Sequence, residues 1–131
     1  MTNTNLLLQE LFTTIQTLRG KNGCPWDKRQ TSQSLIKYIK SESEELIQAI
    51  ENADKDNTCE ELGDLLYLII MLTEISKERG HFQFPDVLQT INEKLIRRHP
   101  HVFAGTPYAS EKELADQWKA IKAAEKKKLS I

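Results

Sequence analysis

Residues 42–51 read ESEELIQAIE and residues 60–66 read EELGDLL, and these two stretches decide the fold. Each belongs to a longer segment in which apolar residues recur at spacings of three and four, which is typical of the buried face of an α-helix. No segment of the chain shows the sustained alternation of a β-strand. The pattern therefore predicts two helices, joined by a short polar turn, in an all-α protein.

Two acids interrupt the apolar face of the first of these helices. Because an α-helix turns by about 100° per residue, Glu45 falls within roughly 60° of Glu42, and so do five apolar or aromatic residues: Leu35, Tyr38, Ile39, Leu46 and Ala49. Glu44 and Glu51 fall on the opposite side, where solvated acids normally lie. Glu42 and Glu45 are therefore predicted to point toward the protein interior.

The second helix repeats the arrangement with Glu61 and Asp64, which share a face with Leu65, Leu68, Leu72 and Ile75. Burying one ionised carboxylate costs several kcal/mol, and four of them would also repel one another. No lysine or arginine shares these faces at neighbouring positions. Ligand sets made only of oxygen suit Mg²⁺, Mn²⁺ or Ca²⁺, so we predict a metal site formed by Glu42, Glu45, Glu61 and Asp64.

Two other interpretations of these acids explain fewer of the residues. Glu61 fits a capping box with Thr58, and Glu60 fits one with Asn57, but a cap would account for only one of the four acids. A di-iron bundle needs two Glu-x-x-His motifs, and the chain has a single match that starts at Glu78. The magnesium-type site therefore remains the preferred interpretation.

The rest of the chain predicts further helices separated by glycine- and proline-containing loops. Ser110 and Glu113 have the spacing of a capping box at the start of the last helix. Short connections favour antiparallel neighbours, so we expect a bundle of about five helices in a single domain over residues 1–131. The expected helices span residues 4–19, 32–53, 58–79, 84–98 and a segment from 110 onward, with loops at 20–31, 54–57 and 100–108.

Composition excludes several classes of protein. The net charge of −1 provides no general attraction to nucleic acid or to an anionic membrane, so neither is expected as a partner. The longest apolar run, residues 65–72, is too short to span a bilayer, and the first residues do not resemble a signal peptide. Cys24 and Cys59 are too few for a disulfide framework or a structural zinc site. We therefore expect a cytoplasmic protein.

Candidate substrate contacts lie outside the acid-bearing helices. Lys94, Arg97 and Arg98 occupy one helical patch, suited either to phosphate binding or to a solvated helix end. Trp26 and Trp118 are candidates for stacking on a nucleobase, although burial in the core is the commoner role of tryptophan. His99 and His101 flank a proline, so a structural role is expected for them.

Four segments of the chain resemble one known family: residues 22–31 (NGCPWDKRQT), 42–51, 60–66 and 91–103 (INEKLIRRHPHVF). This family is the MazG family of nucleoside triphosphate pyrophosphohydrolases, and the resemblance extends from Leu7 to Glu125. It implies hydrolysis of nucleoside triphosphates to a monophosphate and pyrophosphate, with a housekeeping role in the nucleotide pool. It also implies a helical homodimer or tetramer that uses Mg²⁺, or Mn²⁺ in its place. The metal-binding and catalytic residues would be Glu42, Glu45, Glu61 and Asp64.

One residue departs from the family pattern. The family has an acid immediately before the first metal-ligand position, and Ser41 stands there in this chain. Family members also occur as tandem two-domain chains, and this sequence is similar to their first half. The alternative to an enzyme is therefore a catalytically weak or inactive helical module that binds a nucleotide or a partner protein.

Overall fold

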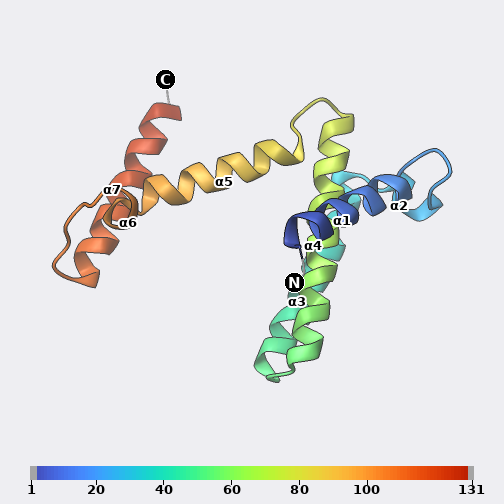
Figure 1. Cartoon of the computed structure of the whole chain (residues 1–131), viewed down its shortest axis with the longest axis horizontal. Coiled ribbons are helices and arrows are strands. Elements are labelled where there is room, and N and C mark those ends of the chain that lie inside the picture. The colour runs from blue at the N-terminus through green and yellow to red at the C-terminus, as the bar shows by residue number, and fades with distance from the viewer. Residues whose placement is uncertain (1–2, 130–131) are drawn as a thin grey trace. The chain divides into compact units, whose positions relative to one another are not determined.

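The structure is a computed structural model that describes residues 3–129, and within that range it contains seven helices and no strand. The all-α prediction is confirmed, and five of the helices correspond to the five expected ones. Figure 1 shows the helices in chain order: α1 (Thr4–Leu18), α2 (Pro25–Arg29), α3 (Ser32–Glu51), α4 (Lys55–Glu78), α5 (Phe84–Arg98), α6 (Pro100–Phe103) and α7 (Glu111–Leu129).

The two short helices, α2 and α6, lie where the sequence predicted loops. Each begins with a proline, Pro25 in α2 and Pro100 in α6. Proline suits the first position of a helix because its φ is already helical and its missing N–H would have no intrahelical partner there. The loop predictions for residues 20–31 and 100–108 are therefore wrong over these single turns.

Helix α4 starts earlier than predicted. The Asp54 carboxylate accepts a hydrogen bond of 3.1 Å from the Asn57 backbone N–H and caps the helix. The predicted turn at 54–57 therefore supplies the cap and first turn of α4. The capping roles considered for Glu60 and Glu61 are excluded, because both lie beyond the first turn. The connection from α3 is short, and within it Ala53 has a left-handed φ of +54°.

The start of α7 agrees with its prediction in part. The Ser110 hydroxyl accepts a hydrogen bond of 3.3 Å from the Glu113 backbone N–H, as a capping box requires. The Glu113 carboxylate accepts from the backbone N–H of Ala109 at 2.6 Å, one residue before the expected donor. The pair therefore still marks and stabilises the beginning of the helix.

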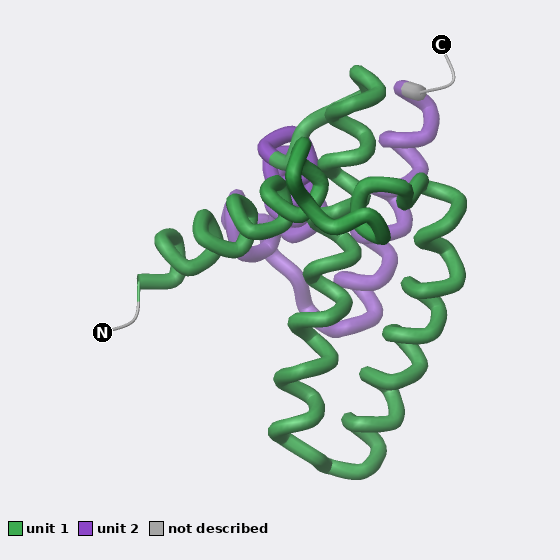
Figure 2. The backbone as a smooth tube through the Cα atoms, turned by 90° about the vertical axis from the view of Figure 1, so that its right-hand side faces the viewer, with its two compact units in different colours: residues 1–84 green, residues 85–131 purple. Residues whose placement is uncertain are grey.

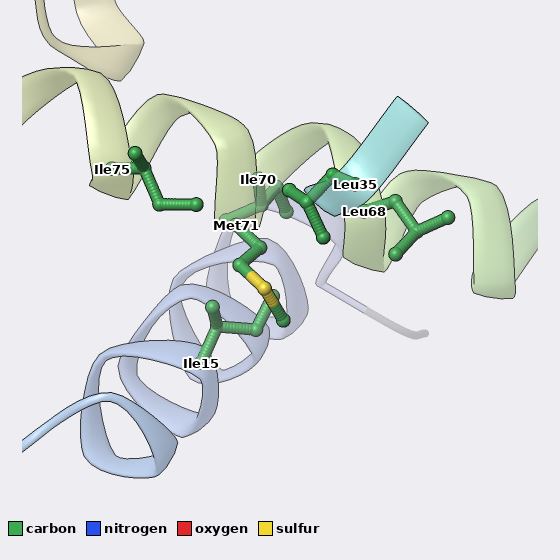
Figure 3. Close-up of a cluster of buried hydrophobic side chains, with 6 residues drawn as sticks. All are labelled: Ile15, Leu35, Leu68, Ile70, Met71 and Ile75. Atoms are coloured by element: carbon green, nitrogen blue, oxygen red, sulfur yellow. The ribbon is translucent and has the colours of Figure 1, made fainter. Parts of the chain in front are cut away.

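The chain divides into two compact units, residues 1–84 and 85–131, which Figure 2 colours separately. In the first unit α4 is central, because it packs against both α3 and α1. Figure 3 shows the core of this unit, in which Met71 of α4 extends toward Ile15 of α1. The buried core residues are Ile15, Leu35, Leu68, Ile70, Met71 and Ile75.

The second unit contains α6, α7 and nearly all of α5. None of its described residues is buried, and α5 and α7 are joined by ion pairs from Arg97 and Arg98 to Glu125. The single domain over residues 1–131 stays a prediction. Within the described range, no helix has the length and apolar character needed to cross a membrane.

Candidate metal centre

The antiparallel pair α3 and α4 carries all four predicted metal ligands (Figure 1). Glu61 is buried, with 8% of its surface exposed, and Glu42 is half-buried. Glu44 and Glu51, predicted to lie on the opposite side of α3, are exposed. Glu45, predicted to point inward with Glu42, is instead exposed, because it lies about 60° from Glu42 at the edge of the apolar face. The helical phase deduced from the apolar pattern is therefore correct for Glu42 and Glu61 and for the two outer acids, and the inward prediction for Glu45 is wrong.

Three of the four acids meet at one point. Glu42, Glu45 and Glu61 each offer a carboxylate oxygen, and these three oxygens lie within 4.8 Å of one another. Asp64 is half-buried one turn after Glu61 and does not belong to this group of three. Its charge nevertheless acts on Glu42, so it borders the cluster.

The electrostatics of the cluster reflect carboxylates crowded together, of which Glu61 is buried, Glu42 is half-buried and Glu45 is exposed. Burial, followed by the neighbouring Glu42 and Glu45 carboxylates, raises the pKa of Glu61 to about 7. Burial also raises the pKa of Glu42, with the charges of Glu45 and Asp64 adding to the shift and Glu61 opposing it. The protein alone therefore favours a proton on this cluster near neutral pH.

The donor set fits a hard divalent cation. One oxygen of Glu42 and one of Glu61 are buried and have no hydrogen-bond partner. Within residues 3–129, no ion pair involves any of the four acids. Buried charges are normally paired or bound to a metal, and oxygen ligands are the preference of Mg²⁺ and Mn²⁺. Glu42, Glu45 and Glu61 could therefore hold such an ion, with Asp64 at the edge.

Trp26 lies on the short helix α2 and packs against the core of the first unit. Its ring meets that of Tyr38 edge to face, with the ring centroids 5.2 Å apart. The apolar pattern placed Tyr38 only on the inward face of its helix, and no pattern marked Asp27, which is buried and accepts a hydrogen bond from Tyr67. The available signal was the position of Asp27 inside the NGCPWD segment.

The predicted phosphate-binding bases lie in the second unit. Arg97 and Arg98 both bind the Glu125 carboxylate, at 2.7 and 2.8 Å, while Lys94 is half-buried on the same helix. These two arginines, Arg98 first, lower the pKa of Glu125 to about 2. Half of the Arg97 side chain remains exposed, compared with 16% of Arg98.

Trp118 is half exposed on α7, and the Lys122 ammonium lies 5.4 Å from the centre of its ring. Trp118 lies at core-like helical spacing from Leu114, Ala115 and Ile121, but this spacing does not bury it within the second unit. His99 and His101 have their ring centroids 5.7 Å apart, and His99 Nδ1 lies 2.6 Å from the Leu95 carbonyl oxygen. The His99 ring thus contacts the end of α5, which is consistent with the structural role expected for it.

The two acid-bearing helices belong to a segment that matches a known protein family. The model of the MazG nucleotide pyrophosphohydrolase domain matches residues 30–103, more than half of the chain. The chain belongs to the MazG family. The match includes both acid-bearing helices and ends after the HPHVF segment.

Individual MazG relatives agree with this assignment. The chain is 46% identical, over 98% of its length, to the nucleoside triphosphate pyrophosphohydrolase/pyrophosphatase MazG of Thermotoga maritima. It is 40% identical, over 91% of its length, to the nucleoside triphosphate pyrophosphohydrolase of Escherichia coli K12. These matches cover 49% and 46% of the two relatives, so the chain spans about half the length of either.

A solved structure matches almost completely. The crystal structure of a mazG-related protein from Thermotoga maritima superposes with a TM-score of 0.73 at 28% identity. The superposition covers 88% of this chain and 98% of that one. The arrangement of helices is therefore one that a MazG-related protein adopts.

Proposed function

We propose that this chain hydrolyses nucleoside triphosphates to a nucleoside monophosphate and pyrophosphate, using Mg²⁺ or Mn²⁺. The observation that carries the proposal is the group of three carboxylates, with its two unpartnered buried oxygens, in a member of the MazG family. Both relatives described above are named for this activity. We assign the whole of residues 1–131 to one MazG-like domain.

Each group of residues has a distinct task in this proposal. A bound divalent ion would polarise a phosphoryl oxygen and lower the pKa of a water molecule. Glu42, Glu45, Glu61 and Asp64 would hold the ion. Lys94, Arg97 and Arg98 neutralise phosphate charge, which phosphoryl-transfer transition states require. Trp26 and Trp118 offer aromatic surfaces to the base.

The bond that breaks is the one between the α-phosphorus and the oxygen that bridges it to the β-phosphorus. Water oxygen bonds to the α-phosphorus, the bridging oxygen leaves with pyrophosphate, and the water protons pass to solvent. The chain has no GxxxxGK[ST] loop of the kind that cradles β- and γ-phosphates. Hydrolysis in ¹⁸O-labelled water should therefore place the label in the monophosphate. Label confined to pyrophosphate would instead assign the attack to the β-phosphorus.

Release of pyrophosphate tests the function itself. The full chain is incubated with each common nucleoside triphosphate and Mg²⁺, with a chelator and Glu61→Gln as matched negative controls. Pyrophosphate should appear only with the metal and the unaltered carboxylate. Release of orthophosphate and a diphosphate would refute the proposal.

The non-catalytic alternative has one specific observation in its favour. Ser41 occupies the position where the family pattern has an acid, so the chain has one carboxylate fewer to share among metal ions. Nucleotide binding without pyrophosphate release, at saturating Mg²⁺ and Mn²⁺, would favour this alternative.

We also propose a homodimer or tetramer, in the cytoplasm. Exposed apolar stripes on α3 and α4 support the assembly: Ile36, Ile47 and Ile50 on one, and Leu62, Leu66 and Ile69 on the other. Both stripes are rotated by about 100° from the acids in the chain direction, which in an antiparallel pair turns them to the same side. A second copy would cover this face, and light scattering should report at least a dimer. The free thiols of Cys24 and Cys59 suit a reducing compartment.

A further inference from the structure

The five-residue helix α2 is held in place by side chains from three neighbouring helices. Arg19, next to the end of α1, donates through Nη1 to the backbone carbonyl oxygens of Asp27 and Gln30. Ser34 of α3 donates to the Gln30 side-chain oxygen at 2.7 Å. Tyr67 of α4 donates its hydroxyl hydrogen bond to the Asp27 carboxylate. A helix of this length has little stability of its own, so these contacts set its position.

The entry into α2 is equally constrained. A Cβ atom on Gly23 would lie 2.1 Å from the Leu18 carbonyl oxygen, so only glycine permits this approach of the loop to α1. The Cys24 backbone N–H donates to the same oxygen at 2.8 Å. Pro25 then starts the helix with a fixed φ. Together these residues determine where the next side chain, Trp26, is placed.

Helix α2 meets the acid-bearing pair close to the acids. Tyr38, which contacts the Trp26 ring, lies one turn before Glu42 and on the same face of α3. Tyr67 lies about one turn after Asp64 on α4, rotated by roughly 60° from it. Trp26 therefore stands at one end of the face that carries the carboxylates.

Asp27 is an energetically unfavourable residue for a contact that serves only to stabilise the fold. Its side chain is 5% exposed, and burying a carboxylate costs more free energy than one hydrogen bond from a neutral hydroxyl returns. An apolar residue of similar size would stabilise the fold at least as well. Burial and the Asp27 carboxylate raise the pKa of Tyr67, which keeps its hydroxyl a donor. The hydrogen bond between Tyr67 and Asp27 is therefore better suited to fixing the position of α2 than to stabilising the fold.

We propose that Asp27 is a positioning residue for the substrate's nucleobase: bonded to Tyr67, it fixes α2 and so holds Trp26 against Tyr38. The inference rests on the proposed function, in which Trp26 contacts the base. Asp27 itself touches neither the substrate nor the metal. Its loss should weaken substrate binding while leaving the chemistry of the carboxylates intact.

Fluorescence and kinetics of the full chain test this role together. The chain has two tryptophans, so Trp118→Phe leaves Trp26 as the sole indole reporter. Asp27→Ala, Asp27→Asn and Tyr67→Phe are compared in this background by emission and acrylamide quenching, and in the natural background by kinetics. Ser76→Ala is the matched control, because it removes another buried hydroxyl of α4, one that bonds only within the helix.

Asp27→Ala and Tyr67→Phe should shift Trp26 emission, increase its quenching, and raise KM by about tenfold with kcat changed by less than about twofold. Asp27→Asn should behave as the natural protein does, because the amide oxygen still accepts from Tyr67. Ser76→Ala should leave Trp26 emission and KM unchanged.

Three results would overturn the proposal. These are unchanged emission and KM in Asp27→Ala and Tyr67→Phe, an Asn variant as impaired as the Ala variant, and loss of cooperative melting in both impaired variants. If the natural chain releases no pyrophosphate, the proposed function fails separately. The emission of the Trp118→Phe series then still decides whether Asp27 fixes Trp26.

Discussion

The two compact units of this chain are built from the same kind of element but differ in what they bury. Every buried residue of the described range lies between Ile15 and Ser76, in the first unit. In the second unit the apolar faces of α5 and α7 stay open, with Leu95 47% exposed and Trp118 50% exposed. The acids belong to the unit with a core and the bases to the unit without one. The first unit should therefore hold its acids in place by its own packing. The stability of the second unit should depend on whatever covers the apolar faces of α5 and α7.

The largest expected effect lies at the acids of the first unit. Glu42→Gln, Glu45→Gln, Glu61→Gln and Asp64→Asn should each lower turnover by about a hundredfold or more, because each would remove a proposed metal ligand. Steady-state pyrophosphate release measures the loss.

Glu44→Gln and Glu51→Gln are the matched controls, since both acids are exposed on the opposite side of α3. They should retain nearly full turnover. Equal losses in the two groups would contradict the assignment of the metal site to Glu42, Glu45, Glu61 and Asp64.

Core truncation compares the two units directly. Met71 is fully buried in the first unit, so Met71→Ala should lower the free energy of unfolding by about 2–5 kcal/mol. Leu95→Ala, in the second unit, should cost less than about 0.5 kcal/mol in dilute protein. Denaturant titration gives both values. A cost for Leu95→Ala that grows with protein concentration would show that a second copy covers α5.

The stability that a bound metal ion adds to the first unit should depend on pH. The pKa of Glu61 is raised from 4.5 to about 7, so its contribution to stability is fully present below 4.5 and is lost as the pH rises through about 7. Mg²⁺ binds the ionised form, so the gain in Tm over chelator should increase between about pH 6 and about pH 8. Glu61→Gln should abolish most of that gain. Identical melting curves with Mg²⁺ and chelator at both pH values would rule out the metal centre.

The smallest expected effect concerns the ion pairs of the second unit. The pKa of Glu125 is lowered to about 2, chiefly by Arg98, so this contribution is present above 4.5 and is lost as the pH falls toward 2. Glu125→Gln should speed hydrogen exchange in α7 and leave the Tm of the first unit unchanged. Asp116→Asn, an exposed change on the same helix, should alter neither. A lower Tm for the whole chain would contradict the separation of the units.

The sequence correctly predicted those parts of the fold that the helical spacing of apolar residues reveals. The phase of the apolar residues on α3 and α4 located Glu42 and Glu61 on the inward face, because rotation per residue is nearly constant along a helix. The five long helices followed from the same signal. Helices α2 and α6 did not, because a single turn is too short to show a period, and their prolines resemble loop signals.

The sequence did not predict contacts between residues that lie far apart along the chain. Arg98 and Glu125 are separated by 27 residues, and Tyr67 and Asp27 by 40, so no local pattern relates them. The exposure of Trp118 was missed for a related reason. An apolar stripe predicts that a helix face is covered, but it does not identify what covers it.

The short turn at Ala53 is the midpoint about which the four acids of the candidate metal centre are arranged. Glu45 and Glu61 lie eight residues before and after Ala53, and Glu42 and Asp64 lie eleven residues before and after it. The acids are thus mirror images in the sequence, which brings them to matching heights on two antiparallel helices. One residue added to or removed from either helix between the acids and this turn would displace one pair by about 1.5 Å and rotate it by about 100°. The number of helical residues between the acids and this turn is therefore constrained, even at positions where other substitutions would leave the helices intact.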